Sequence, residues 1–166
     1  ASSDSLSDDE HISLPVTLWT LYLLRETTPP AHTNANYDLK IKVPIDADPF
    51  ENDDTAATAT FLGPVGTIPP GTGLSIHRDG DPAFFEVKAA GDGVMTVALT
   101  FTHALGNIDF RVFEEVGGVL TQVGGGTTTS DNEIDFVTVT NGLTYVIEVF
   151  GVGGAINPDY DLDIIS

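Results

Sequence analysis

The chain has 166 residues, a length that suits one domain with a buried core or one domain plus a fragment, and its 25 acidic and 6 basic side chains give a net charge of −19. Such a surface repels phosphate backbones and anionic lipid, which argues against nucleic acid and membranes as partners. No cysteine is present to form a disulfide, and the longest apolar run, LWTLYLL, is too short to span a bilayer, so membrane insertion is not expected.

The first 42 residues contain predicted strands at 10–16, 18–25 and 37–43. Residues 7–41 also align without a gap onto residues 130–164, and 11 of the 35 positions are identical. The similarity is strongest between NANYDLKIKV and NPDYDLDIIS. Self-similarity at a fixed offset indicates a repeated structural unit. Residues 1–42 are therefore interpreted as a partial repeat, the closing strands of a sandwich whose other strands lie elsewhere.

A domain boundary is predicted in the segment KVPIDAD, where Pro44 ends the preceding strand. Residues 43–166 then form the complete domain. The segment DDTAATATFL is assigned at most one short helical turn. Further strands are predicted at 73–78, 83–88, 95–101, 107–113, 118–123, 133–139, 143–150 and 159–165.

These later segments alternate apolar and polar residues with a period of two, and glycine and proline clusters separate them. In MTVALTF, for example, Met95, Val97 and Leu99 share one face. No segment has a convincing apolar period of 3.6 residues. The sequence therefore predicts an all-β protein, an antiparallel β-sandwich of jelly-roll type with extra N-terminal strands.

Residues 48–165 resemble the bacterial pre-peptidase C-terminal domain family, a β-sandwich attached to many secreted peptidases and surface proteins. The matching motifs occur in order: DPFENDDTAATA, RDGDPAFFEV, AAGDGVMTVALTF, NIDFRVFEEVGGVLTQV and NGLTYVIEVFGVGGAINPDYDLDI. Residues 7–41 resemble the closing third of a preceding copy. The resemblance implies a secreted, extracellular or cell-surface protein.

Some members of this family bind calcium between the two loops that correspond to DPFENDD and RDGD. Residue by residue, the resemblance carries this site to Glu51, Asp53, Asp54, Asp79 and Asp81, and to Asp48 at its margin. Calcium takes six to eight oxygen ligands and tolerates irregular geometry, which suits such a group of carboxylates. The alternative is that the six acids only form turns and carry solvated charge.

No catalytic constellation is apparent in the sequence. The four histidines are scattered, and no zinc-binding spacing or nucleophile elbow occurs. We therefore expect a protein that is not an enzyme.

The partial repeat leaves three arrangements open. It completes a preceding sandwich in a tandem array, it completes a sandwich in another subunit and so builds a filament, or it packs on its own domain. Each of the first two predicts association with identical or repeat-related domains, as in a structural or adhesive surface protein. The alternative function is an accessory domain of a secreted hydrolase that binds extracellular protein or polysaccharide.

Overall fold

The computed structural model describes residues 23, 45–64 and 73–165. The chain divides into two units after Pro44, and the fold described here is that of the second unit, which begins at Ile45. The predicted partial repeat at 1–42, with its three strands, lies outside the described residues except for Leu23, which is exposed. Its assignment as closing strands therefore stays a prediction.

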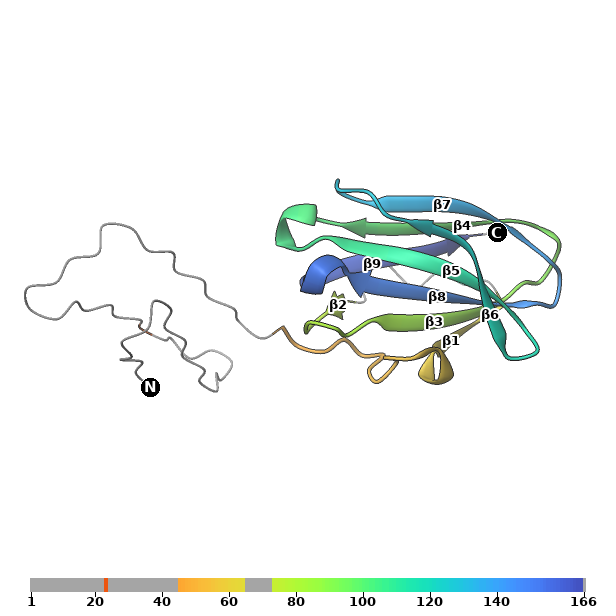
Figure 1. Cartoon of the computed structure of the whole chain (residues 1–166), viewed down its shortest axis with the longest axis horizontal. Helices are drawn as coiled ribbons and strands as arrows, with labels where there is room; N and C mark the ends of the chain where they lie inside the picture. The colour runs from red at the N-terminus through yellow and green to blue at the C-terminus, as the bar shows by residue number, and fades with distance from the viewer. Residues whose placement is uncertain (1–22, 24–44, 65–72, 166) are drawn as a thin grey trace, which may run out of the picture. The chain divides into compact units, whose positions relative to one another are not determined.

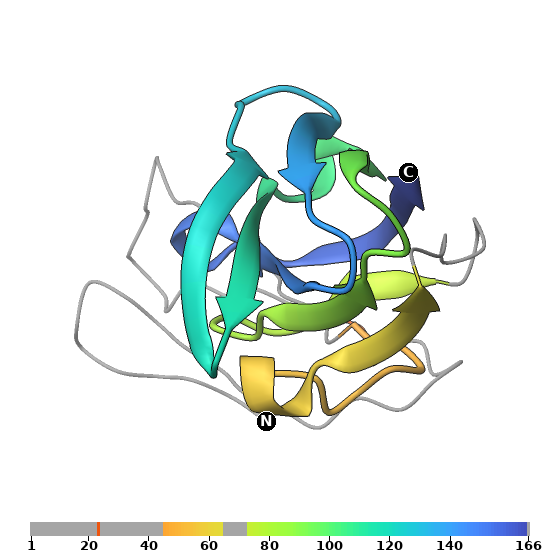
Figure 2. The same cartoon turned by 90° about the vertical axis from the view of Figure 1, so that its right-hand side faces the viewer.

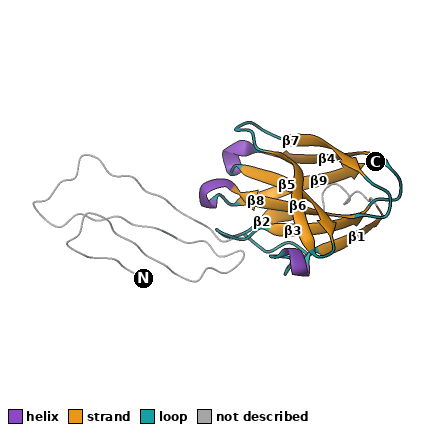
Figure 3. Ribbon diagram, turned by 45° about the vertical axis from the view of Figure 1, so that its right-hand side comes forward, coloured by secondary structure: helices purple, strands orange, loops and turns teal. Residues whose placement is uncertain are grey.

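Within residues 45–64 and 73–165, nine strands form two sheets that face each other (Figures 1 and 3). One sheet has the order β1-β3-β8-β5-β6 and the other has the order β2-β9-β4-β7, and all pairs are antiparallel except β1 with β3. The strands are β1 (Thr60–Pro64), β2 (Leu74–Ile76), β3 (Ala83–Lys88), β4 (Gly93–Phe101), β5 (Ile108–Val116), β6 (Val119–Gly126), β7 (Glu133–Val139), β8 (Thr144–Gly151) and β9 (Asn157–Ile165). Three short 3-10 turns complete the described part, η1 (Ala56–Thr58), η2 (His103–Leu105) and η3 (Val152–Gly154).

The hydrophobic core lies between the two sheets and follows the period-two pattern of the sequence. In β4, Met95, Val97 and Leu99 are fully buried, whereas the alternate residues face outward. The same alternation buries Tyr160, Leu162 and Ile164 in β9, and these residues belong to the same core cluster. The structure thus confirms the all-β sandwich, and among the described residues no helix has the length and apolar character needed to cross a membrane.

One strand was not predicted. Strand β1 lies at the edge of its sheet and pairs in parallel with β3, and Figure 2 shows it with η1 at the rim of the sandwich. It contains Gly63 and Pro64, two residues that normally count against a strand, and an edge position tolerates both because one side of the strand needs no ladder hydrogen bonds. The short helical turn predicted nearby is confirmed as η1.

The bend between η2 and β5 depends on a glycine. Gly106 has a φ of 150°, and a Cβ atom built there would overlap the carbonyl oxygen of Ile156. The Gly106 carbonyl accepts a hydrogen bond of 2.8 Å from the side-chain amide of Asn157, which is completely buried at the start of β9. The bend and the first residue of β9 therefore fix each other.

We expect Gly106→Ala to lower the free energy of unfolding by about 2–4 kcal/mol, because the new methyl group must displace backbone. Equilibrium denaturant unfolding would measure the loss. Gly91→Ala is the matched control, since a Cβ atom there has no neighbour within 4 Å. Equal stability of the two variants would contradict the prediction.

Candidate metal centre

Hydrogen bonds and a contact between aromatic rings tie the loop before η1 to the sandwich. The backbone N–H of Phe84 donates to the carbonyl of Asp53 at 2.9 Å, and the ring of Phe50 packs edge-on against Phe85 with 6.1 Å between centroids. The carboxylate of Asp48 accepts the backbone N–H groups of Phe50 at 2.9 Å and Ser75 at 3.1 Å. These contacts hold the loop against β2 and the start of β3.

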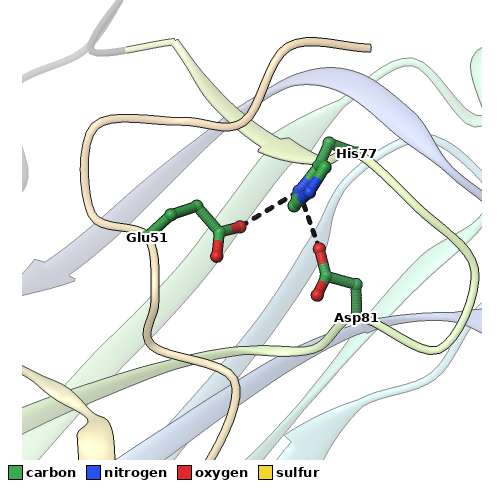
Figure 4. A group of neighbouring side chains, drawn as sticks. All are labelled: Glu51, His77 and Asp81. Carbon is green, nitrogen blue, oxygen red and sulfur yellow. Dashed lines mark ion pairs between the residues drawn. The ribbon is translucent and has the colours of Figure 1, made fainter. Parts of the chain in front are cut away.

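Two groups of possible metal ligands meet in this place. The first consists of Glu51, Asp53 and Asp54, and the second of Glu51, His77 and Asp81. Within each group, one ligand atom from every residue lies within 4.8 Å of the others. Figure 4 shows the second group, with the loop carrying Glu51 on one side and the β2–β3 connection carrying His77 and Asp81 on the other.

Several carboxylate oxygens of the cluster are buried without a hydrogen-bond partner. They include Oδ2 of Asp53, which is only 1% exposed, Oδ1 of Asp54 and Oδ2 of Asp81, which is 5% exposed. Buried polar atoms in folded proteins are normally paired, and an unpaired charged oxygen is costly. Unpartnered oxygens from two loops that converge on one place are what a bound cation would satisfy.

The electrostatic potential of the cluster is strongly negative. Burial raises the pKa of Asp53 to about 7, and the negative charges of Asp48, Glu51 and Asp54 contribute to this shift. The pKa of Glu51 is also raised, first by burial and then by the charge of Asp81, with His77 acting in the opposite direction. Both shifts mean that burial, together with the neighbouring carboxylates, disfavours the ionised forms of Asp53 and Glu51.

One cation of the protein already touches the cluster from outside. The guanidinium of Arg78 donates to Asp81 Oδ1 from Nε at 2.8 Å and lies 3.1 Å from Asp54 Oδ2. Its pKa is raised, mainly by the hydrogen bond to Asp81. The side chain of Arg78 is 59% exposed, so it links the two loops at the surface and leaves Asp54 Oδ1 and Asp81 Oδ2 facing elsewhere.

The structure brings four of the six predicted ligands together, namely Glu51, Asp53, Asp54 and Asp81. Asp48 belongs to neither group, because two backbone N–H groups already bind its carboxylate, although its charge acts on Asp53. Asp79 also belongs to neither group. Its side chain is exposed and its carboxylate lies beside Gly154, with Oδ1 only 2.6 Å from the position that a Cβ atom of residue 154 would take.

Sequence reasoning missed two residues at this place. His77 was treated as one of four scattered histidines, yet its position four residues before Asp81 in HRDGD was a usable signal. Tyr160 has a buried hydroxyl without a partner, and its pKa is raised well above the usual value, first by burial and then by the charge of Asp48. No local sequence signal connects Tyr160 in β9 with a loop more than a hundred residues earlier.

Comparison with solved structures shows a likeness of fold. No family model and no curated protein matches the chain. A solved structure, the pre-peptidase C-terminal domain of collagenase from Bacillus anthracis, aligns with a TM-score of 0.48 and 14% sequence identity, covering 64% of this chain and 94% of that one.

Proposed function

We propose that the chain is a non-catalytic β-sandwich module of an extracellular protein, that calcium stabilises it, and that it associates with repeat-related domains in a structural or adhesive assembly. The calcium site rests on the convergence of Glu51, Asp53 and Asp54 with Asp81, and on the unpartnered oxygens buried there. All of these ligands are hard oxygen donors, which Ca²⁺ prefers. A bound ion would lock the loop before η1 onto the start of β3.

The assembly role rests on the sequence repeat. The second copy of the repeat, residues 130–164, contains β7, β8 and almost all of β9. Strand β8 lies inside one sheet and β9 inside the other. A segment with this sequence cannot build a sandwich by itself, because the partners of its strands, β3, β4 and β5, have no counterpart among residues 1–44.

The repeat preserves the positions that face the core. Tyr160, Leu162 and Ile164 are each at most 1% exposed, and the equivalent residues in the first copy are Tyr37, Leu39 and Ile41. The buried Asn157, Glu133, Val139 and Tyr145 also recur unchanged, as Asn34, Glu10, Val16 and Tyr22. The outward-facing positions of β9 differ more, with Lys40 and Lys42 in place of Asp163 and Ile165. Leucines replace three further buried residues, Val137, Val146 and Ile147, and one buried apolar position becomes charged, because Glu26 takes the place of Val149.

This pattern of kept and changed positions supports the proposal that residues 1–42 close a second sandwich of the same kind. The sandwich of residues 45–166 already contains its own β7, β8 and β9. The expected partner is therefore a repeat unit that supplies strands equivalent to β1–β6 and lacks its own closing strands. Strand addition of this kind combines main-chain pairing with burial of alternate side chains.

A split-domain experiment tests the assembly role. We expect residues 45–129, which contain β1–β6, to become soluble and folded when coexpressed with residues 130–166, and to be rescued also by residues 1–44. Leu39→Asp with Ile41→Asp should abolish the second rescue, because both positions correspond to fully buried residues of β9. Lys40→Ser, at an outward position, is the matched control. Copurification followed by circular dichroism would measure each outcome.

Rescue by residues 130–166 without rescue by residues 1–44 would contradict the assembly role. It would leave the accessory function in a secreted hydrolase as the better proposal, for which the sequence resemblance to pre-peptidase C-terminal domains is the support.

A further inference from the structure

His77 lies between two carboxylates from different loops. Its Nδ1 is 3.0 Å from Oε1 of Glu51 and 2.7 Å from Oδ2 of Asp81 (Figure 4). All three side chains are largely withdrawn from solvent, with exposed fractions of 16% for His77, 14% for Glu51 and 2% for Asp81. Glu51 comes from the loop before η1, and His77 and Asp81 come from the connection between β2 and β3.

Hydrogen bonding alone does not account for this arrangement. One ring nitrogen carries at most one proton, so it cannot direct an N–H bond at both Glu51 and Asp81. Both His77 Nδ1 and Asp81 Oδ2 are buried without a hydrogen bond of good geometry, although they are only 2.7 Å apart. Three donor atoms thus crowd around one point, where a single imidazole can balance the charge of at most one of the two carboxylates.

The spacing of these atoms fits ligands on one side of an octahedral ion. Ligands held about 2.1 Å from a metal at right angles to each other are about 3.0 Å apart, whereas tetrahedral angles separate them by about 3.4 Å. The measured separations of 3.0 and 2.7 Å are nearer the first value. An imidazole nitrogen with two carboxylates is a donor set for a first-row transition ion, because calcium takes oxygen ligands.

We propose that Glu51, His77 and Asp81 form a second cation subsite that binds a divalent first-row transition metal ion. The subsite shares Glu51 and Asp81 with the proposed calcium site, and it uses His77 where the calcium site uses Asp53 and Asp54. The inference therefore builds on the proposed calcium site, yet it depends on a nitrogen ligand that the calcium site does not use. A metal ion bound here would join the β2–β3 connection to the loop before η1.

Isothermal titration of the whole chelator-treated chain with Co²⁺ and, separately, with Ca²⁺ tests the subsite. We expect His77→Gln to weaken Co²⁺ binding at least tenfold and to leave the Ca²⁺ affinity within about twofold. Asp53→Asn should do the opposite, because Asp53 belongs only to the oxygen group. His103→Gln is the matched control, since this histidine is also half-buried but belongs to neither metal-ligand group of the described residues.

The outcomes separate the two proposals. Loss of Co²⁺ binding only in His77→Gln supports the subsite, even if Ca²⁺ binds to no form of the chain and the calcium proposal fails. Unchanged Co²⁺ binding by His77→Gln overturns the subsite, as does an equal loss of both ions. Should this variant not fold, NMR of the wild-type chain decides. Co²⁺ should then shift or broaden the His77 ring signals at lower concentrations than those of the other three histidines, and the reverse order overturns the subsite.

Discussion

Saturating calcium is expected to raise the free energy of unfolding of this chain by about 4 kcal/mol, and Asp53→Asn is expected to remove most of that gain. A ligand that binds only the folded state contributes about 4 kcal/mol at a concentration of 1,000 times its dissociation constant. For a sandwich of this size the corresponding rise in melting temperature is roughly 10–20 °C. Thermal melts in calcium and in chelator would measure it.

The expected gain has a specific physical cause. Without a cation, the cluster confines several carboxylates in a small buried volume, and Asp53 Oδ2 has no hydrogen-bond partner there. A divalent ion turns this repulsion into attraction. Since Asn carries no charge, Asp53→Asn replaces a charged ligand oxygen with a neutral amide oxygen. It thereby removes part of the attraction to the ion and relieves the repulsion in the metal-free form.

The matched control for this variant is Asp159→Asn. Asp159 is exposed on β9 and belongs to neither metal-ligand group, so its substitution should leave the calcium-dependent shift intact. A wild-type melting temperature that does not differ between calcium and chelator would contradict the calcium proposal. A shift of equal size in Asp53→Asn and in the wild type would show that calcium binds elsewhere.

Most of the sandwich could be predicted from the sequence because its strands bury one face against the other sheet. The predicted ranges 83–88 and 133–139 coincide with β3 and β7. The alternation of apolar and polar residues reveals a strand wherever one face of that strand is buried. The edge strand β1 escaped prediction because half-exposed residues and two strand breakers replace the alternation there.

The candidate site was predictable in part, for a different reason. Its oxygen ligands stand in two short acidic motifs, and the resemblance to a family in which some members bind calcium between the corresponding loops singles them out. The direction of each side chain depends on contacts made after folding. Asp48 turns toward the N–H of Ser75, 27 residues away, and Asp79 lies against Gly154. His77 joins the cluster only because β2 ends beside the loop that carries Glu51.

In metal-free solution the chain should lose stability as the pH rises from about 4 to about 7. Burial and neighbouring charges raise the pKa of Asp53 from 3.8 to about 7 in the folded state, so the folded chain binds a proton more tightly than the unfolded chain does. A group whose pKa is raised by folding stabilises the protein below its unfolded pKa, and this stabilisation is lost as the pH passes the folded value. The raised pKa of Glu51 acts in the same direction.

The contribution of Asp53 can be isolated by comparing the wild type with Asp53→Asn across this pH range. Asn resembles the protonated acid, so the two unfolding free energies should agree near pH 4 and diverge until the variant is more stable by up to about 4 kcal/mol at pH 8. Groups that do not interact with Asp53 contribute equally to both chains and cancel in the difference. Denaturant unfolding in chelator at several pH values would measure the divergence. If the difference in unfolding free energy between the two chains stays constant with pH, Asp53 keeps an ordinary pKa and the prediction is wrong. Added calcium should reverse the sign of this difference above pH 7, because the ion stabilises the ionised carboxylate that Asn cannot provide.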